Sequence, residues 1–116
     1  MRFKLIMALV DDRHTEAILQ AARSAGATGA TVVTSARGEG VEPEKSFLGL
    51  DISGQRDLLM FLVAEQLARD ILERISKTGR FEERPGAGIA FQLAIEDAVG
   101  LSSQFRVISE EIQDQI

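Results

Sequence analysis

Several residue types that often carry chemistry are absent from this sequence or nearly so. The 116 residues contain no cysteine and a single histidine, His14. Without cysteine the chain can form no disulfide and has no thiolate nucleophile, which fits a cytoplasmic protein. With one histidine and no cysteine, a single chain cannot assemble a His/Cys metal site or a Cys–His pair. The carboxylates around His14 are more typical of a solvated helix start than of a metal site, so we expect no metal.

The residues needed for common hydrolytic sites are also missing. The sequence has no asparagine, which ferredoxin-like acylphosphatases need for catalysis. The glutamate pairs at 82–83 and 110–111 are typical of solvated charge, and nothing places them as a general acid and base. We therefore expect no catalytic residues and no enzyme.

Long apolar runs and excess positive charge are lacking as well. No apolar run approaches the roughly 20 residues that a membrane span needs. The apolar part of residues 1–10 is too short for a signal peptide. The net charge of −5 argues against binding to nucleic acid or to an anionic membrane surface. The aromatic signature of RNA-recognition modules is missing too. We expect a cytoplasmic protein with no nucleic-acid partner and no membrane insertion.

What the sequence does contain is an alternation of strand and helix patterns. Asp11 and Asp12 follow the first apolar run and suit the start of a helix, which Gly26 ends. The apolar run at 58–64 is consistent with a buried strand or with the first turns of one long helix over 58–77, and we favour the strand. The predicted elements are a strand over 3–10, a helix over 15–25, strands over 30–36 and 58–64, a helix over 67–77 and a strand over 89–95.

This order predicts an α+β fold in one domain spanning residues 1–116. Two successive βαβ units give the ferredoxin-like βαββαβ sandwich, a four-stranded antiparallel sheet with both helices on one face. Its other face would be apolar and uncovered, so we expect oligomerisation. In the C-terminal extension at 99–116, isoleucines four residues apart indicate either a last amphipathic helix or a frayed end.

The long loop at 37–54 is the first candidate for a functional segment. It has no steady period, and structureless segments of this length are uncommon in compact domains. It also carries apolar side chains that a purely solvated loop does not need. These side chains suit either local packing or a partner protein.

A second candidate is the stretch 76–91, where glycines alternate with Arg80 and Arg84. Glycines let the backbone approach a ligand closely, and arginines donate charge-assisted hydrogen bonds. The combination suits a phosphate. A helix cap followed by a simple turn would use the same glycines, so this stretch alone leaves both interpretations open.

The motifs in these segments resemble those of the P-II signalling family. In that family a Gly-x-Thr-Gly-x-Thr-Val strand leads to a basic-Gly-x-Gly step at the base of a long loop, and residues 26–40 show the same pattern. Residues 78–81 with 86–88 resemble the family's phosphate loop, Thr-Gly-basic-apolar followed by Gly-x-Gly. The similarity extends along most of residues 3–98 and is specific for the superfamily, not for its classical nitrogen-regulatory branch.

The resemblance implies a homotrimer that holds an adenine nucleotide, such as ATP, ADP or AMP, in the cleft between neighbouring subunits. The loop at 37–54 would report the bound effector to a target protein, either a transporter or an enzyme. Thr31 and Leu62 would lie against the base, although either could be an ordinary strand residue. The residues expected at the phosphates are Gly38 and Gly40 at the loop base, and Thr78, Gly79, Arg80, Gly86 and Gly88 on the other side.

Departures from the family pattern bear on the ligand. Ala87-Gly88-Ile89 stands where the family has Asp-Gly-Lys, and the paired arginines after the last strand are absent. Charge-assisted contacts are worth ~1.5–3 kcal/mol each, so these losses weaken triphosphate binding by orders of magnitude. Arg80 and Arg84 are the nearest replacements. A diphosphate, a monophosphate or another anion therefore fits the sequence as well as ATP does.

Two further departures remove other family functions. Val41 and Glu42 replace a basic residue and a glutamine, which undermines coordination of 2-oxoglutarate and Mg²⁺. The chain has no tyrosine, so uridylylation of a loop tyrosine is impossible. Two functions remain. One is a trimeric, ligand-sensing signal protein; the alternative is a trimeric binding or scaffold module of the related divalent-cation-tolerance type, without nucleotide.

Overall fold

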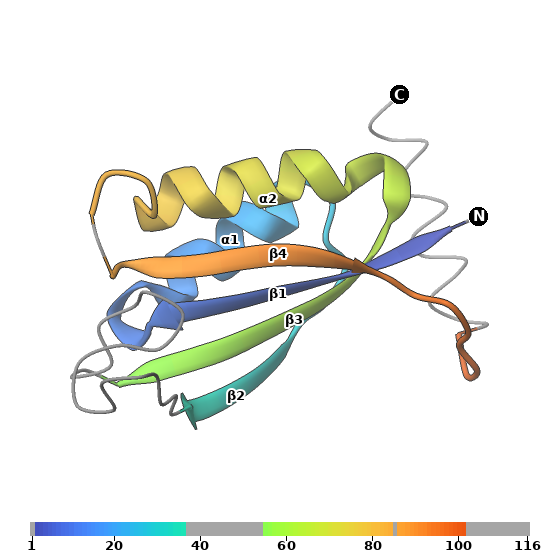
Figure 1. Ribbon diagram of the computed structural model, residues 1–116, viewed down its shortest axis with the longest axis horizontal. Helices are drawn as coiled ribbons and strands as arrows, with labels where there is room; N and C mark the ends of the chain where they lie inside the picture. Colours follow the sequence, from blue (N-terminus) through green and yellow to red (C-terminus); the bar gives the residue numbers. More distant parts are fainter. Residues whose placement is uncertain (1, 37–54, 85, 102–116) are drawn as a thin grey trace.

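The computed structural model describes residues 2–36, 55–84 and 86–101. Within them lies one antiparallel sheet with strand order β2-β3-β1-β4. Both helices cover the same face of this sheet (Figure 1), so the predicted ferredoxin-like α+β fold is confirmed. The elements are β1 (Phe3–Asp11), the 3₁₀ turn η1 (Asp12–His14), α1 (Thr15–Ser24), β2 (Thr31–Ala36), β3 (Arg56–Ala64), α2 (Glu65–Gly79) and β4 (Gly88–Ala94).

The element boundaries differ from the sequence prediction in small ways that have local causes. Strand β3 gives way to α2 directly at Glu65, so the alternative of one long helix is wrong. The predicted carboxylate cap belongs to η1 instead of α1, because the Asp11 side chain accepts the backbone N–H of Arg13 at 2.9 Å. The loop at 37–54 and the predicted C-terminal helix lie outside the described residues.

The core lies between the helices and the sheet. Alternate residues of β1 and β3 point to the helices, and helically spaced residues of α1 and α2 meet them. Burying side chains of this size stabilises the fold by ~1.5–3 kcal/mol each. The largest fully buried side chains are Phe61, Ile6, Ile18, Leu59, Ile71, Ile75, Val10 and Val63.

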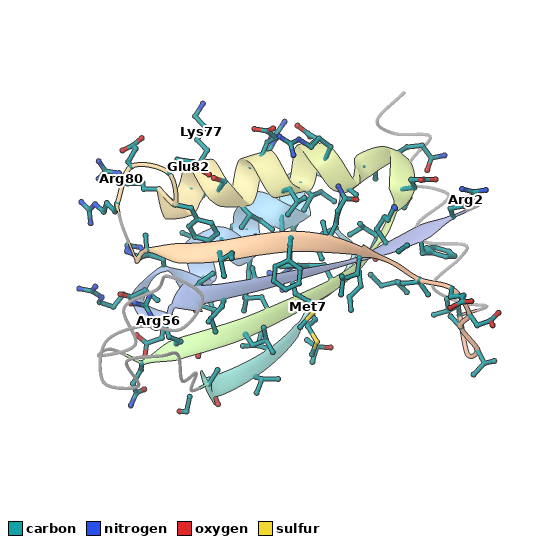
Figure 2. All side chains as sticks on the ribbon, viewed as in Figure 1. Arg2, Met7, Arg56, Lys77, Arg80 and Glu82 are labelled. Carbon is teal, nitrogen blue, oxygen red and sulfur yellow. The ribbon has the colours of Figure 1, made fainter. Side chains whose placement is uncertain are left out.

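The second face of the sheet is apolar, and none of the described residues forms a helix over it. We call it the open face; Met7 lies on it (Figure 2). Its apolar side chains are half-buried or exposed, and Leu93 is 45% exposed. The strand register places on it Leu5, Met7 and Leu9 of β1, Leu58, Met60 and Leu62 of β3, and Ile89, Phe91 and Leu93 of β4.

A buried hydrogen bond joins the start of α1 to the start of β3. The Thr15 hydroxyl donates to Asp57 Oδ2 at 2.7 Å, and the two residues are 6% and 8% exposed. Asp57 alternates with Leu58 along β3 and therefore points toward the helices. A carboxylate buried here needs such a donor to offset its lost hydration.

We expect Thr15→Val to lower the free energy of unfolding by about 1–3 kcal/mol, because it keeps the side-chain shape and removes the donor to a buried carboxylate. Urea denaturation measures this change. Thr15→Ser is the matched control, since it keeps the hydroxyl and loses one methyl group, worth about 0.8 kcal/mol. Equal stability of the Val and Ser variants would contradict this role for the hydrogen bond.

Candidate functional site

The residues predicted to contact the base meet at one edge of the sheet. Thr31 begins β2 and lies opposite Met60 in the register with β3. A cavity of about 340 Å³ opens here, lined by Thr28, Gly29, Ala30, Thr31, Met60 and Leu62. Residues 28–30 belong to no helix or strand, so their peptide groups are not committed to a sheet ladder. The structure therefore brings Thr31 and Leu62 together around a cavity with both apolar and hydrogen-bonding groups.

The predicted phosphate residues lie on the turn between α2 and β4. Thr78 and Gly79 are the last residues of α2, with Thr78 exposed and Gly79 buried. Arg80 follows in the left-handed conformation, at φ 56° and ψ 41°, and ends the helix. The Phe81 N–H donates to the Ser76 carbonyl at 3.0 Å, which closes the cap. The chain then turns through Gly86, at φ 81°, into β4.

The aromatic ring of Phe81 occupies the space beside two of the predicted phosphate glycines. A Cβ added at Gly79 would lie 2.3 Å from Phe81 Cε1, and one at Gly88 would lie 2.4 Å from the same atom. A Cβ at either position would therefore force the Phe81 ring to shift, and at Gly88 it would also lie 2.9 Å from the Leu9 carbonyl oxygen. Contact of Gly79 and Gly88 with a phosphate stays a prediction.

Arg80 points to the outer end of the turn (Figure 2), where it pairs with a neighbouring carboxylate. Its Nε and Nη2 atoms both lie 2.9 Å from Glu83 Oε2. The two side chains are 52% and 65% exposed, so a ligand in solution can reach both of them.

The base of the long loop lies at the same end of the sheet as this turn. The last residue of β2, Ala36, is opposite Arg56, and Arg56 is opposite Asp11. Gly88 is opposite the preceding β1 residue, Val10. Gly38 and Gly40, the predicted contacts from the loop base, lie outside the described residues, so their role stays a prediction.

Arg56 is a candidate that the sequence analysis missed. It is 7% exposed, and its place in the register puts it on the open face at the loop base. The sequence could have indicated Arg56 as the first basic residue after the loop at 37–54. Only the strand register shows which residues lie beside it. Its guanidinium adds a positive charge at the loop base, which acts on Asp11.

Asp11 adds a fixed negative charge close to the loop base. The Arg13 guanidinium donates to it through Nε at 3.0 Å and through Nη2 at 2.6 Å. These bonds, with a smaller contribution from the charge of Arg56, hold the pKa of Asp11 well below its usual range. Asp11 therefore stays ionised under ordinary conditions and partly balances the positive charge beside it.

Within residues 2–36, 55–84 and 86–101, no three His, Cys, Asp or Glu side chains gather closely enough to hold a metal ion. None of the helices in this part of the chain is long and apolar enough to cross a membrane.

We expect Gly79→Ala to lower the free energy of unfolding by about 1–3 kcal/mol, because the new methyl group overpacks the turn against Phe81. Helix propensity alone would favour alanine over glycine by about 1 kcal/mol. A decrease in the free energy of unfolding therefore indicates overpacking, and an increase indicates helix propensity. Chemical denaturation of Gly79→Ala, Phe81→Ala and the double variant measures the coupling between the two sites.

Gly29→Ala is the matched control, since a Cβ at Gly29 meets nothing within 4 Å and should change stability little. If Gly79→Ala costs the same with and without the Phe81 ring, packing against that ring is not the reason for the glycine.

Comparison with known proteins agrees with this geometry. Residues 3–104 match the family described as nitrogen regulatory protein P-II. No curated protein matches the sequence. Among solved structures, a PII-like signalling protein from Thermus thermophilus is 26% identical, with 82% of this chain and 88% of that chain covered and a TM-score of 0.60.

Two structures of CPII, a PII-like protein from Thiomonas intermedia, are also similar at 20% identity. The apo form covers 82% of this chain and 90% of its own, with a TM-score of 0.63. The form bound to ADP, AMP and acetate covers 83% of this chain and 90% of its own, with a TM-score of 0.60. At this identity the likeness shows the shared fold.

The family match spans most of the chain, well beyond the glycine motifs that first indicated it. P-II proteins are regulators and not enzymes, so the expectation of a non-enzymatic protein is confirmed at the level of the family. The chain belongs to the P-II nitrogen regulatory protein family, as a PII-like signalling protein.

Proposed function

We propose that this protein binds an adenine nucleotide in clefts between the subunits of a homotrimer and reports occupancy to a target protein, a transporter or an enzyme, through the loop at 37–54. One observation carries the proposal: the two parts of the candidate site lie on opposite edges of one sheet. Thr31 is on β2 and Gly88 is on β4, with β3 and β1 between them.

The separation of these edges is too large for a compact site within one chain. Neighbouring strands are about 4.8 Å apart, so three intervals separate the two edges by roughly 14 Å across the sheet. The side chains of β1 and β3 lie between. When β2 of one copy approaches β4 of a second copy, the base cavity and the phosphate turn face each other. The site is then complete only between subunits.

The open face supplies a reason for the copies to assemble. It is lined by leucine, methionine, isoleucine and phenylalanine side chains from three adjacent strands. An apolar sheet face of this size is normally buried. Packing the open faces of several copies against one another would bury it and would bring unlike sheet edges side by side.

The chemistry of each part supports a nucleotide. Leu62 and Met60 give the base cavity an apolar side, while Thr28 and Thr31 add hydroxyl groups that can donate or accept. Arg80 offers an exposed guanidinium group at the end of the sheet where the phosphates would lie. The CPII structure, which is bound to ADP and AMP, shows that a protein of this fold takes nucleotides with fewer phosphates than ATP.

One observation favours the alternative, a binding or scaffold module of the divalent-cation-tolerance type. Phe81 accounts for Gly79 and Gly88 without any ligand, and Glu83 already pairs with Arg80. In that case the clefts between subunits would hold no nucleotide. The oligomer and the cytoplasmic location are common to both proposals.

Isothermal titration calorimetry with AMP, ADP and ATP separates the two functions. We expect at least one of them to bind with a dissociation constant below about 1 mM, which corresponds to roughly −4 kcal/mol. Arg80→Ala should weaken that binding about tenfold or more, because it removes a charge-assisted donor.

Arg74→Ala is the matched control, since Arg74 is an exposed arginine on α2 that pairs with Asp70. It should leave nucleotide affinity within about twofold. Absence of binding by all three nucleotides would leave the scaffold function in place. Equal losses in the two arginine variants would remove Arg80 from the site.

Light scattering after size-exclusion chromatography tests the assembly. We expect a trimer for the unmodified chain and a smaller species for Phe91→Glu, because a carboxylate on the open face would be buried unpaired at the interface. Ala17→Glu, an apolar-to-charged change on the exposed surface of α1, should remain trimeric. A monomeric unmodified chain would contradict the intersubunit site.

A further inference from the structure

We propose that Glu83 determines which nucleotide this site prefers, because its carboxylate competes with the ligand for Arg80. The inference rests on the proposed function and adds a residue that selects against highly charged ligands. It starts from the contacts of the turn between α2 and β4.

The Glu83 carboxylate occupies one edge of the Arg80 guanidinium. Oε2 of Glu83 lies 2.9 Å from Nε and 2.9 Å from Nη2, so a single oxygen accepts from both donors. Phosphate oxygens bind the same donor groups of an arginine that a carboxylate uses. Glu83 therefore stands where a phosphate oxygen would stand, and a ligand that uses this edge must displace it.

The backbone of the turn holds the two residues in this relation. The N–H groups of Glu83 and Arg84 both donate to the Arg80 carbonyl, at 3.2 and 3.0 Å. Arg80 itself ends α2 in the left-handed conformation, which starts the turn that carries Glu83. The contact is thus built by the winding of the turn and does not require a neighbouring subunit.

The exposure of the pair makes the competition reversible. Because Arg80 is 52% exposed and Glu83 is 65% exposed, water screens their attraction and the contact is weak. A ligand can replace the carboxylate at small cost. The displaced carboxylate stays near the cleft, however, where it repels the phosphates of the ligand.

That repulsion grows with the charge of the ligand. The negative charge of the nucleotide rises from AMP through ADP to ATP. Glu83 should therefore weaken the binding of ATP most and the binding of AMP least. The loss of the family's basic residues also weakens the binding of highly charged nucleotides, as repulsion by Glu83 would. Together they favour nucleotides with fewer phosphates.

Glu82 provides a matched control on the same turn. It carries the same charge one residue earlier, and it lines the groove between α2 and β4 together with Ser76 and Phe81. Figure 2 labels Glu82 beside the helix and Arg80 at the outer end of the turn. Removing either charge changes the net charge of the turn equally, but it is Glu83 whose carboxylate pairs with Arg80.

The test is calorimetric titration of Glu83→Gln and Glu82→Gln with AMP, ADP and ATP at low and fixed ionic strength. We expect Glu83→Gln to tighten binding by about twofold to fivefold, the range set by exposed ion pairs. The gain should be largest for ATP. Glu82→Gln should give a smaller gain, and thermal unfolding should show that both variants fold like the unmodified chain.

The same substitution in an Arg80→Ala background completes the cycle. In the Arg80→Ala background, Glu83→Gln should raise nucleotide affinity no more than Glu82→Gln does. The reason is that Glu83 competes with the nucleotide only when Arg80 is present. Equal gains in nucleotide affinity for Glu83→Gln and Glu82→Gln would overturn the role of Glu83. A larger gain for Glu83→Gln that persists in the Arg80→Ala background would do the same. Either result would leave the proposed nucleotide site intact. Failure of every variant to bind any nucleotide would overturn the proposed function as well.

Discussion

Within the described residues the helices cover one face of the sheet only, and the proposed assembly and ligand site both depend on this constraint. The helices bury one set of alternating side chains, which leaves Met7, Met60 and Phe91 on the open face. A monomer would expose this face to water, whereas packing between copies would bury it. The same packing would bring edge strands β2 and β4 of different copies together. The proposed assembly and the proposed ligand site thus rest on the same feature of the sheet.

Much of the fold could be predicted from the sequence because the relevant signals are local. The β-branched run of β2 and the helical spacing from Leu67 to Ile75 each specify an element within a few residues. Those elements in that order leave few topologies, and the ferredoxin-like one is confirmed. The strand at 56–64 is the hardest element to assign, because an apolar run of that length suits either a buried strand or a buried helix.

The candidate site was only partly predictable, because its contacts depend on register and on the winding of one turn. Family resemblance predicts that Thr31 and Leu62 share a site, and in the structure both line one cavity. Arg56 acquires its position only when β3 is paired with Asp11 and Ala36, across a long loop. The hydrogen bond between Thr15 and Asp57 joins residues separated by 42 positions, and no periodicity indicates it.

The turn between α2 and β4 shows why a glycine motif does not by itself identify a phosphate site. The sequence pattern indicates Gly79 and Gly88 as ligand contacts, yet each faces the ring of Phe81. Arg80 ends α2 in the left-handed conformation and lies at the outer end of the turn (Figure 2). The glycines leave room for Phe81, Arg80 is exposed on the same turn, and in the proposed site Glu83 would set how strongly an anion must compete for it.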